Sequence, residues 1–132
     1  ADGRKARQFY ADDLSPMLGA DRNGPTAIVL SCGNLDFSNC AGGEVLDMKF
    51  HPSALASPEG RSKFSALIKT YFKIGGMQTQ INVLDNTVLL DAQKHPENYR
   101  DLMVRIWGFS AYFVAIDKHW QDHIIARSTL SF

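Results

Sequence analysis

Apolar side chains recur at helical spacing in four parts of the 132-residue chain. They predict helices over residues 27–35, 58–73, 87–94 and 118–128, each with one face turned towards a core. Each follows a residue that can cap a helix start, and the second also has a proline in its first turn. The predicted caps are Thr26, Ser57, Asn86 or Thr87, and Asp117. The residues expected inward are Phe64, Leu67, Ile68, Tyr71 and Phe72 in the second helix, and Trp120, Ile124 and Ile125 in the last.

Two segments have the pattern of strands. Residues 45–50 are rich in apolar side chains and lead to a proline, which ends a strand. Further along, Gln78, Gln80 and Asn82 alternate with apolar residues and a threonine. This spacing favours a sheet with one face in water. The alternative is that the three uncharged amides line a buried polar cavity, where each needs a hydrogen-bond partner.

A third apolar stretch, residues 103–116, is interrupted by Gly108. Taken alone, a glycine between two aromatic residues indicates a bulge or tight bend in a hairpin, where positive φ or close backbone approach is needed. The first 25 residues have no period and many turn-forming residues. Because such a long irregular segment needs something to lie against, we expect that the chain is not self-sufficient. The pattern as a whole predicts a single α+β domain over residues 1–132.

Charge and composition exclude several functions. Fourteen Lys and Arg balance 14 Asp and Glu, which argues against a nucleic-acid or anionic-membrane binder, since both depend on excess positive charge. The longest apolar runs are far shorter than the roughly 20 residues needed to cross a bilayer. Cys32 and Cys40 form no metal or redox motif. Two free thiols in a reducing compartment predict a cytoplasmic protein.

Other candidate sites are weak. His119 and His123 have the spacing of two metal ligands on a helix, but Trp120 stands where a zinc protease needs glutamate. We therefore expect an exposed histidine face and no metal site. The remaining charged groups are interpreted as turn residues and solvated charge: Asp12 with Asp13, and Arg4 with Lys5 and Arg7.

The segment Arg105-Ile106-Trp107-Gly108-Phe109 resembles the radical-bearing signature of glycyl radical enzymes, the pyruvate formate-lyase-like superfamily. The following Ser110-Ala111-Tyr112-Phe113-Val114 is similar to the dehydratase, decarboxylase and lyase branch. Further blocks resemble the family in the family's order along the whole chain: Asp2 to Ala6, Gly24 to Ala27, Met48 to Pro52, Gly75 to Gln78, Asp91 to Glu97, and Gln121 to Arg127.

This resemblance implies that Gly108 stores an unpaired electron on its α-carbon, in a radical loop at about residues 104–113. Arg105, Trp107, Phe109 and Ser110 would support the loop. The chain would bind no cofactor itself, because a separate activase with an iron–sulfur cluster and S-adenosylmethionine installs the radical. The implied fold is α/β, as the C-terminal part of a ten-stranded barrel completed by a larger partner chain.

The resemblance also shows departures. Trp107 replaces the usual small residue before the glycine, Met103 replaces a smaller or β-branched residue, and Phe109 replaces the commoner tyrosine. Neither Cys32 nor Cys40 matches the catalytic cysteine loop. We therefore expect a small radical-bearing subunit, or C-terminal fragment, that is inactive without a large subunit carrying the thiyl cysteine.

The implied reaction is radical cleavage of C–C or C–X bonds in a small-molecule substrate, in anaerobic metabolism. Two alternatives remain open at this point. The chain could be a spare part that repairs an oxygen-damaged enzyme, or a non-catalytic structural subunit in which Gly108 is only a bend. A stoichiometric partner without its own radical glycine separates the first alternative from a split enzyme.

Overall fold

A three-stranded parallel sheet forms the centre of the computed structural model, which describes residue 3, residues 5–6 and residues 8–132. The strand order is β2 (Gln78–Val83), β1 (Val45–Phe50) and β5 (Thr129–Leu130). β1 and β2 pair over six residues each, from Val45 opposite Gln78 to Phe50 opposite Val83. β1 lies between its two neighbours, so it is buried along almost its whole length.

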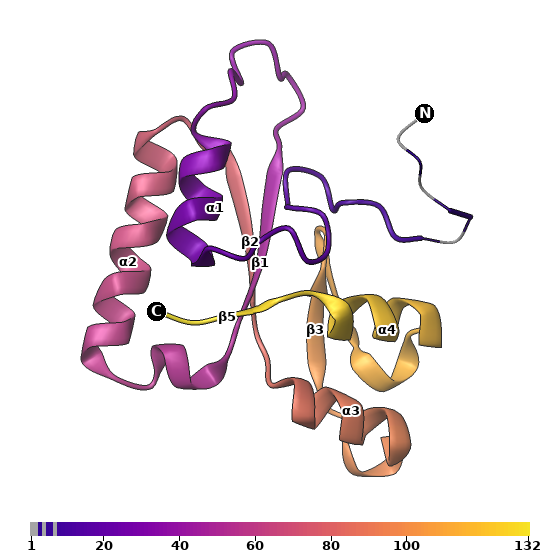
Figure 1. Ribbon diagram of the computed structural model, residues 1–132. Helices are drawn as coiled ribbons and strands as arrows, with labels where there is room; N and C mark the ends of the chain where they lie inside the picture. The colour runs from indigo at the N-terminus through magenta and orange to yellow at the C-terminus, as the bar shows by residue number, and fades with distance from the viewer. Residues whose placement is uncertain (1–2, 4, 7) are drawn as a thin grey trace.

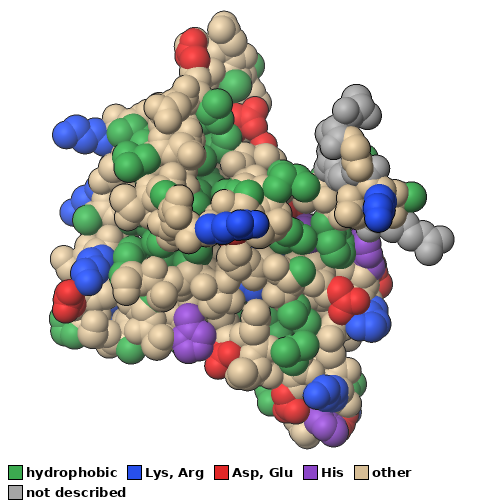
Figure 2. All heavy atoms as spheres, in the orientation of Figure 1, with side chains coloured by type: hydrophobic (Ala, Val, Ile, Leu, Met, Phe, Trp, Pro, Cys, Tyr) green, Lys and Arg blue, Asp and Glu red, His purple; other side chains and the backbone are tan. Residues whose placement is uncertain are grey.

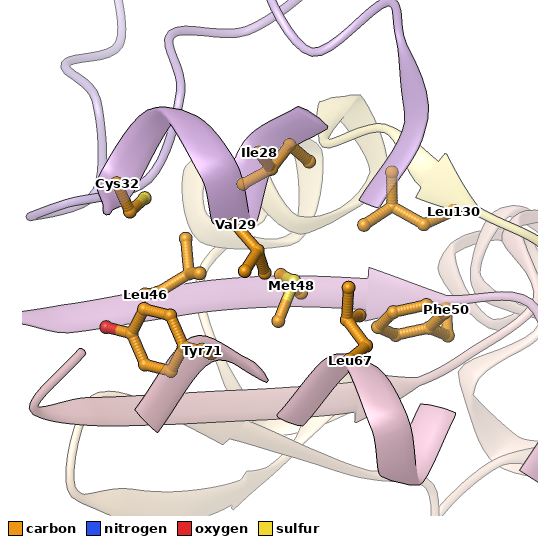
Figure 3. Close-up of a cluster of buried hydrophobic side chains, with 9 residues drawn as sticks. All are labelled: Ile28, Val29, Cys32, Leu46, Met48, Phe50, Leu67, Tyr71 and Leu130. Carbon is orange, nitrogen blue, oxygen red and sulfur yellow. The ribbon is translucent and has the colours of Figure 1, made fainter. Parts of the chain in front are cut away.

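One face of this sheet is covered by α1 (Gly24–Cys32) and α2 (Pro58–Lys73), which lie together on one side of the strands in Figure 1. Alternate residues of β1 point into the space between them, because successive side chains of a strand lie on opposite faces. Figure 3 shows this core, in which α1, β1, α2 and the end of β5 all take part. Its buried members are Ile28, Val29, Cys32, Leu46, Met48, Phe50, Leu67, Tyr71 and Leu130.

The other side holds α3 (Asn86–Lys94), α4 (Lys118–Ala126) and a two-stranded antiparallel hairpin. The hairpin consists of β3 (Met103–Ile106) and β4 (Phe109–Tyr112), in a sheet of their own; it is called the Gly108 hairpin below. Three short 3₁₀ turns complete the fold, η1 (Pro52–Leu55), η2 (Pro96–Asn98) and η3 (Phe113–Ala115). The second core joins α3, β3, η3 and α4: Leu84, Leu89, Ala92, Val104, Phe113 and Ile124.

The four predicted helices are all present; the bounds of α2 agree with the prediction, and the other three differ at one or both ends. α2 begins at Pro58 behind the Ser57 cap, whose hydroxyl accepts from the Gly60 amide at 3.0 Å. α1 begins three residues earlier than predicted, because a proline stands in its first turn, and ends at Cys32. Asp85 caps α3, in place of Asn86 or Thr87, and accepts from the Thr87 amide at 2.8 Å. Phe72 and Trp120, expected inward, are 48% and 36% exposed.

The early irregular segment lies against β1. Residues 8–16, called the N-terminal strap, cross its beginning: Leu14 N–H donates to the Val45 carbonyl at 3.2 Å, and the Asp13 carboxylate accepts from Val45 N–H at 2.8 Å. Ser15 Oγ accepts from Asp47 N–H at 2.9 Å. The strap therefore finds its support within the chain.

Among the described residues, no helix is both long and apolar enough to cross a bilayer. In Figure 2, acidic and basic side chains are scattered over the visible face and do not gather into a patch of one sign.

Candidate functional site: the Gly108 hairpin

Gly108 lies at the exposed tip of the hairpin, in a two-residue connection with Trp107. Both have positive φ, 24° for Trp107 and 82° for Gly108. Two-residue hairpins favour such turns because their backbone matches the twist of the strands. A Cβ on Gly108 would meet no atom within 4 Å, so within this chain the position demands glycine for its φ and not for space.

The hairpin is fastened to the sheet by side-chain amides of β2. The Arg105 N–H donates to Asn82 Oδ1 at 2.9 Å, and Asn82 Nδ2 donates to the Arg105 carbonyl at 3.1 Å. Gln80 Nε2 donates to the same carbonyl at 3.2 Å. Gln80 and Asn82, called the amide clasp below, are each 8% exposed.

The amide clasp corrects one prediction. The favoured solvent-facing strand is wrong for Gln80 and Asn82, which are buried, and right for Gln78, which is exposed. The hairpin and the charged groups of β1 cover this part of β2. Gln78 contributes its backbone instead, since its carbonyl accepts from the Tyr71 hydroxyl at 3.0 Å.

Behind the clasp lie two buried carboxylates, Asp12 and Asp47, and the partly buried Arg127. These three residues are called the charge cluster below. The Arg127 guanidinium contacts one carboxylate with each of its two terminal nitrogens, Asp12 through Nη2 and Asp47 through Nη1. Burial raises the pKa of both carboxyls, and the adjacent Arg127 charge opposes that rise. Gln80 Nε2 also donates to Asp47 Oδ2, at 2.8 Å, so the cluster and the clasp are joined.

His123 lies against the charge cluster and is 3% exposed. Its ring stacks on Phe9 of the strap, with ring centres 4.3 Å apart. Burial, with help from the Arg127 charge, lowers the pKa of His123 to about 4. Asp12 Oδ2 lies 3.3 Å from its Nε2, but the same oxygen is paired with Arg127. With a pKa well below 7, the imidazole is neutral at pH 7. The expected exposed histidine face is thus right for His119 and wrong for His123.

The other candidate residues from the sequence lie in different surroundings. Asp12, interpreted as a turn residue, is instead buried in the charge cluster, whereas Asp13 serves the backbone as expected. Lys5 is exposed, and Arg4 and Arg7 lie outside the described residues. In the described part of the chain, no three His, Cys, Asp or Glu side chains gather as metal ligands.

The remaining residues of the predicted loop surround the tip. The Arg105 guanidinium donates to Ser110 Oγ across the hairpin at 3.4 Å, and Phe109 is 56% exposed. Trp107 meets the ring of Trp120 edge to face, with centres 6.3 Å apart. A hollow of about 580 Å³ adjoins Gly108, lined by Val45, Gln78, Thr79, Gln80, Ile81, Arg105, Trp107 and Gly108.

Neither cysteine belongs to this site. Both are free thiols; Cys32 is buried in the core beneath α1, where burial raises its pKa, and Cys40 is partly buried. Neither lines the hollow beside Gly108.

Sequence reasoning missed the buried charges on β1. Asp47 and Lys49 interrupt an otherwise apolar strand, and such charges in a strand covered on both faces signal buried partners. Lys49 Nζ donates to three oxygens, those of Asn86 Oδ1, Ile124 O and Ile125 O, at 2.8 to 3.2 Å. Burial lowers the pKa of Lys49 to about 8, so its ammonium form persists at neutral pH.

Known proteins match this chain closely over most of its length. The model of the family described as "Glycine radical" matches residues 10–114. Indoleacetate decarboxylase of Tractidigestivibacter scatoligenes is 47% identical over 128 residues, which are 96% of this chain and 14% of that protein. Trans-4-hydroxy-L-proline dehydratase of Clostridioides difficile is 38% identical over 131 residues, 99% of this chain and 16% of that protein.

Solved structures agree. The glycerol-bound form of the B12-independent glycerol dehydratase from Clostridium butyricum superimposes with a TM-score of 0.94 at 46% identity, over 99% of this chain and 17% of that one. The mixed α/β fold is therefore confirmed, and the chain spans about one sixth of the length of these relatives. The matched residues, the identity and the shared fold show that this chain belongs to the glycine radical family.

Proposed function

We propose that this chain carries the radical of an anaerobic glycyl radical enzyme on the α-carbon of Gly108, and passes it to a cysteine on a larger partner chain. One observation carries the proposal: within the region matched by the family, Gly108 occupies the exposed tip of a hairpin with a φ of 82°. Its α-carbon is open to partners on the side where another residue would carry a side chain, since nothing lies within 4 Å of the Cβ position.

The chemistry suits glycine. A radical at its α-carbon has no Cβ to crowd it, so the centre can flatten and share its spin with the carbonyl on one side and the amide nitrogen on the other. Forming it breaks the Cα–H bond, and the hydrogen atom goes to the radical that the activase generates from S-adenosylmethionine. In the transfer step Gly108 takes a hydrogen atom from the cysteine S–H. This restores glycine and leaves a thiyl radical to attack the substrate.

The neighbouring residues hold the tip in place. The amide clasp fixes the backbone of Arg105, three residues before Gly108, and the Arg105–Ser110 contact joins the two strands near the turn. Trp107 and Phe109, 44% and 56% exposed, offer apolar surface beside the tip. We assign these residues to positioning the radical loop and to contacting the partner chain.

The larger chain supplies the rest of the site. Since this chain matches about one sixth of its relatives, the thiyl cysteine, the general base and most of the substrate pocket belong to the partner in this proposal. The reaction would be cleavage of a C–C or C–X bond in a small molecule by a dehydratase, decarboxylase or lyase. This chain would be its radical-bearing subunit, or the C-terminal part of one longer polypeptide, in the cytoplasm.

Two alanine variants test the assignment. The complete enzyme is treated anaerobically with its activase and S-adenosylmethionine, and examined by electron paramagnetic resonance. We expect a carbon-centred doublet that Gly108→Ala abolishes. Gly19→Ala is the matched control, because Gly19 has a φ of 79° and likewise nothing within 4 Å of a Cβ. Both changes should cost stability on the order of 1 kcal/mol.

Only the change at Gly108 should remove the signal. A doublet that persists in Gly108→Ala, or its absence from the activated wild-type enzyme, overturns the proposal. Exposure of the activated enzyme to air gives a second check, since trapping of O₂ at the radical carbon should cut this chain at Gly108.

A further inference from the structure

A continuous row of polar contacts runs from the N-terminal strap to the Gly108 hairpin. Asp12 contacts Arg127, Arg127 contacts Asp47, and Gln80 links Asp47 to the Arg105 carbonyl. Asp12 and Asp47 are only 6% and 7% exposed, so water does not compete for the contacts of their carboxylates. The row joins segments that lie more than 100 residues apart in the sequence.

Gln80 connects Asp47 to the hairpin through a single atom, its side-chain amide nitrogen. Its two hydrogens are both used: one donates to Asp47 Oδ2 at 2.8 Å and the other to the Arg105 carbonyl at 3.2 Å. The conformation of Gln80 therefore depends on where Asp47 Oδ2 lies. That same oxygen accepts from Arg127, which fixes its position from the other side.

We propose that Arg127 is a positioning residue for the Gly108 hairpin, acting through Asp47 and Gln80 on the backbone of Arg105. Its planar guanidinium holds the strap carboxylate and the β1 carboxylate at once, which a point charge cannot do. The importance of this hairpin position for radical chemistry rests on the proposed function, but the mechanical link can be measured without any radical.

No other cation in the described residues is placed to replace Arg127. Lys49, two residues beyond Asp47 on β1, commits its three N–H groups to Asn86, Ile124 and Ile125. Without Arg127, two buried carboxylates would lie close together, with only the imidazole of His123, 3.3 Å from Asp12 Oδ2, beside them. Such a pair takes up a proton or moves apart, and either change disturbs the oxygen that orients Gln80.

Hydrogen exchange of the complete enzyme, measured by mass spectrometry, tests the link. We expect Arg127→Gln to raise amide exchange in residues 105–110 about tenfold, with little change in α2, which is the internal control. In Arg127→Lys, amide exchange of residues 105–110 should lie between that of the wild type and that of Arg127→Gln, because lysine keeps the charge but cannot contact both carboxylates with a planar guanidinium. Lys49→Met is the matched control: it removes a buried cation from the same region whose hydrogen bonds go to Asn86, Ile124 and Ile125 and not to the row.

A double-mutant cycle identifies the route. Gln80→Met removes the last link, so adding Arg127→Gln to it should raise hairpin exchange by much less than Arg127→Gln alone does. In the activated enzyme, Arg127→Gln should alter the line shape of the Gly108 radical. A missing radical in the wild type would contradict the proposed function and leave the exchange result standing.

The link itself is overturned by any of three results: unchanged exchange at residues 105–110 in Arg127→Gln, an equal rise throughout α2, or full additivity with Gln80→Met. If Arg127→Gln does not fold, Asp47→Asn tests the same link, since it keeps a side-chain oxygen for Gln80 but loses the charge that holds Arg127. Its hairpin exchange should rise as well, and wild-type exchange there would equally refute the link.

Discussion

Replacing Asn82 with leucine should release the Gly108 hairpin from the sheet while leaving the rest of the fold in place. Asn82 is the only residue in the described chain whose side chain holds both the N–H and the carbonyl of Arg105, at 2.9 and 3.1 Å. Leucine has a similar size but can neither donate nor accept. Arg105 N–H would then lose its partner, and its carbonyl would keep only the longer bond from Gln80, at 3.2 Å.

The size of the effect follows from these two bonds. A hydrogen bond of this kind contributes about 1 kcal/mol net, and the substitution removes two of them, both part-buried. We therefore expect the opening of the hairpin to become easier by about 2 kcal/mol. That change corresponds to roughly a 30-fold faster exchange of the Arg105 amide, since each 1.4 kcal/mol is a factor of ten.

Exchange of individual amides, followed by nuclear magnetic resonance or by mass spectrometry of peptides, provides the measurement. Thr79→Val is the matched control on the same strand, because it removes one side-chain hydrogen bond to backbone, that of Thr79 Oγ1 to the Leu46 carbonyl at 2.9 Å. Its effect should stay within β1 and β2. If Asn82→Leu leaves the Arg105 amide as protected as in the wild type, the amide clasp does not hold the hairpin and the reasoning is wrong.

Two further predictions concern stability. Burial lowers the pKa of His123 to about 4, so between about pH 4 and pH 6.5 the unfolded chain binds a proton at this residue and the folded chain does not. The unfolding free energy should therefore rise by roughly 3 kcal/mol across that range. His123→Phe, measured by urea titration, should flatten the rise, and an unchanged dependence on pH would contradict this reasoning. The edge-to-face pair of Trp107 and Trp120 should give a coupling energy of about 1 kcal/mol in an alanine double-mutant cycle, whereas additive costs would show that the rings do not interact.

The elements whose signals are local were predictable from the sequence. α2 carries its cap, its proline and its apolar face within 17 residues, and both of its ends are as predicted. A bend at Gly108 was expected from the aromatic residues beside it, and its positive φ agrees with that bend. Both features depend on neighbours in the chain, which a sequence displays directly.

The features that depend on distant segments were not predictable. Alternation along β2 shows that Gln80 and Asn82 share a face, but the burial of that face depends on Asp47 and on a hairpin more than 20 residues away. His123 is buried because Phe9 stacks on it from the far end of the chain. A polar residue in a strand carries no mark of what covers it, so spacing alone leaves both interpretations open.

The way the hairpin is attached bears on how a radical loop can be built. β3 shares no backbone ladder with β2, since the two strands belong to different sheets; its backbone is held at Arg105 by amide side chains instead. A ladder would fix the whole strand along an extended sheet, whereas two side chains fix a single residue and leave the tip free of further bonds to the sheet. The clasp thus anchors the hairpin three residues from Gly108 while its tip stays exposed, which is the arrangement that a glycine needs if it is to be held in place by one chain and reached by another.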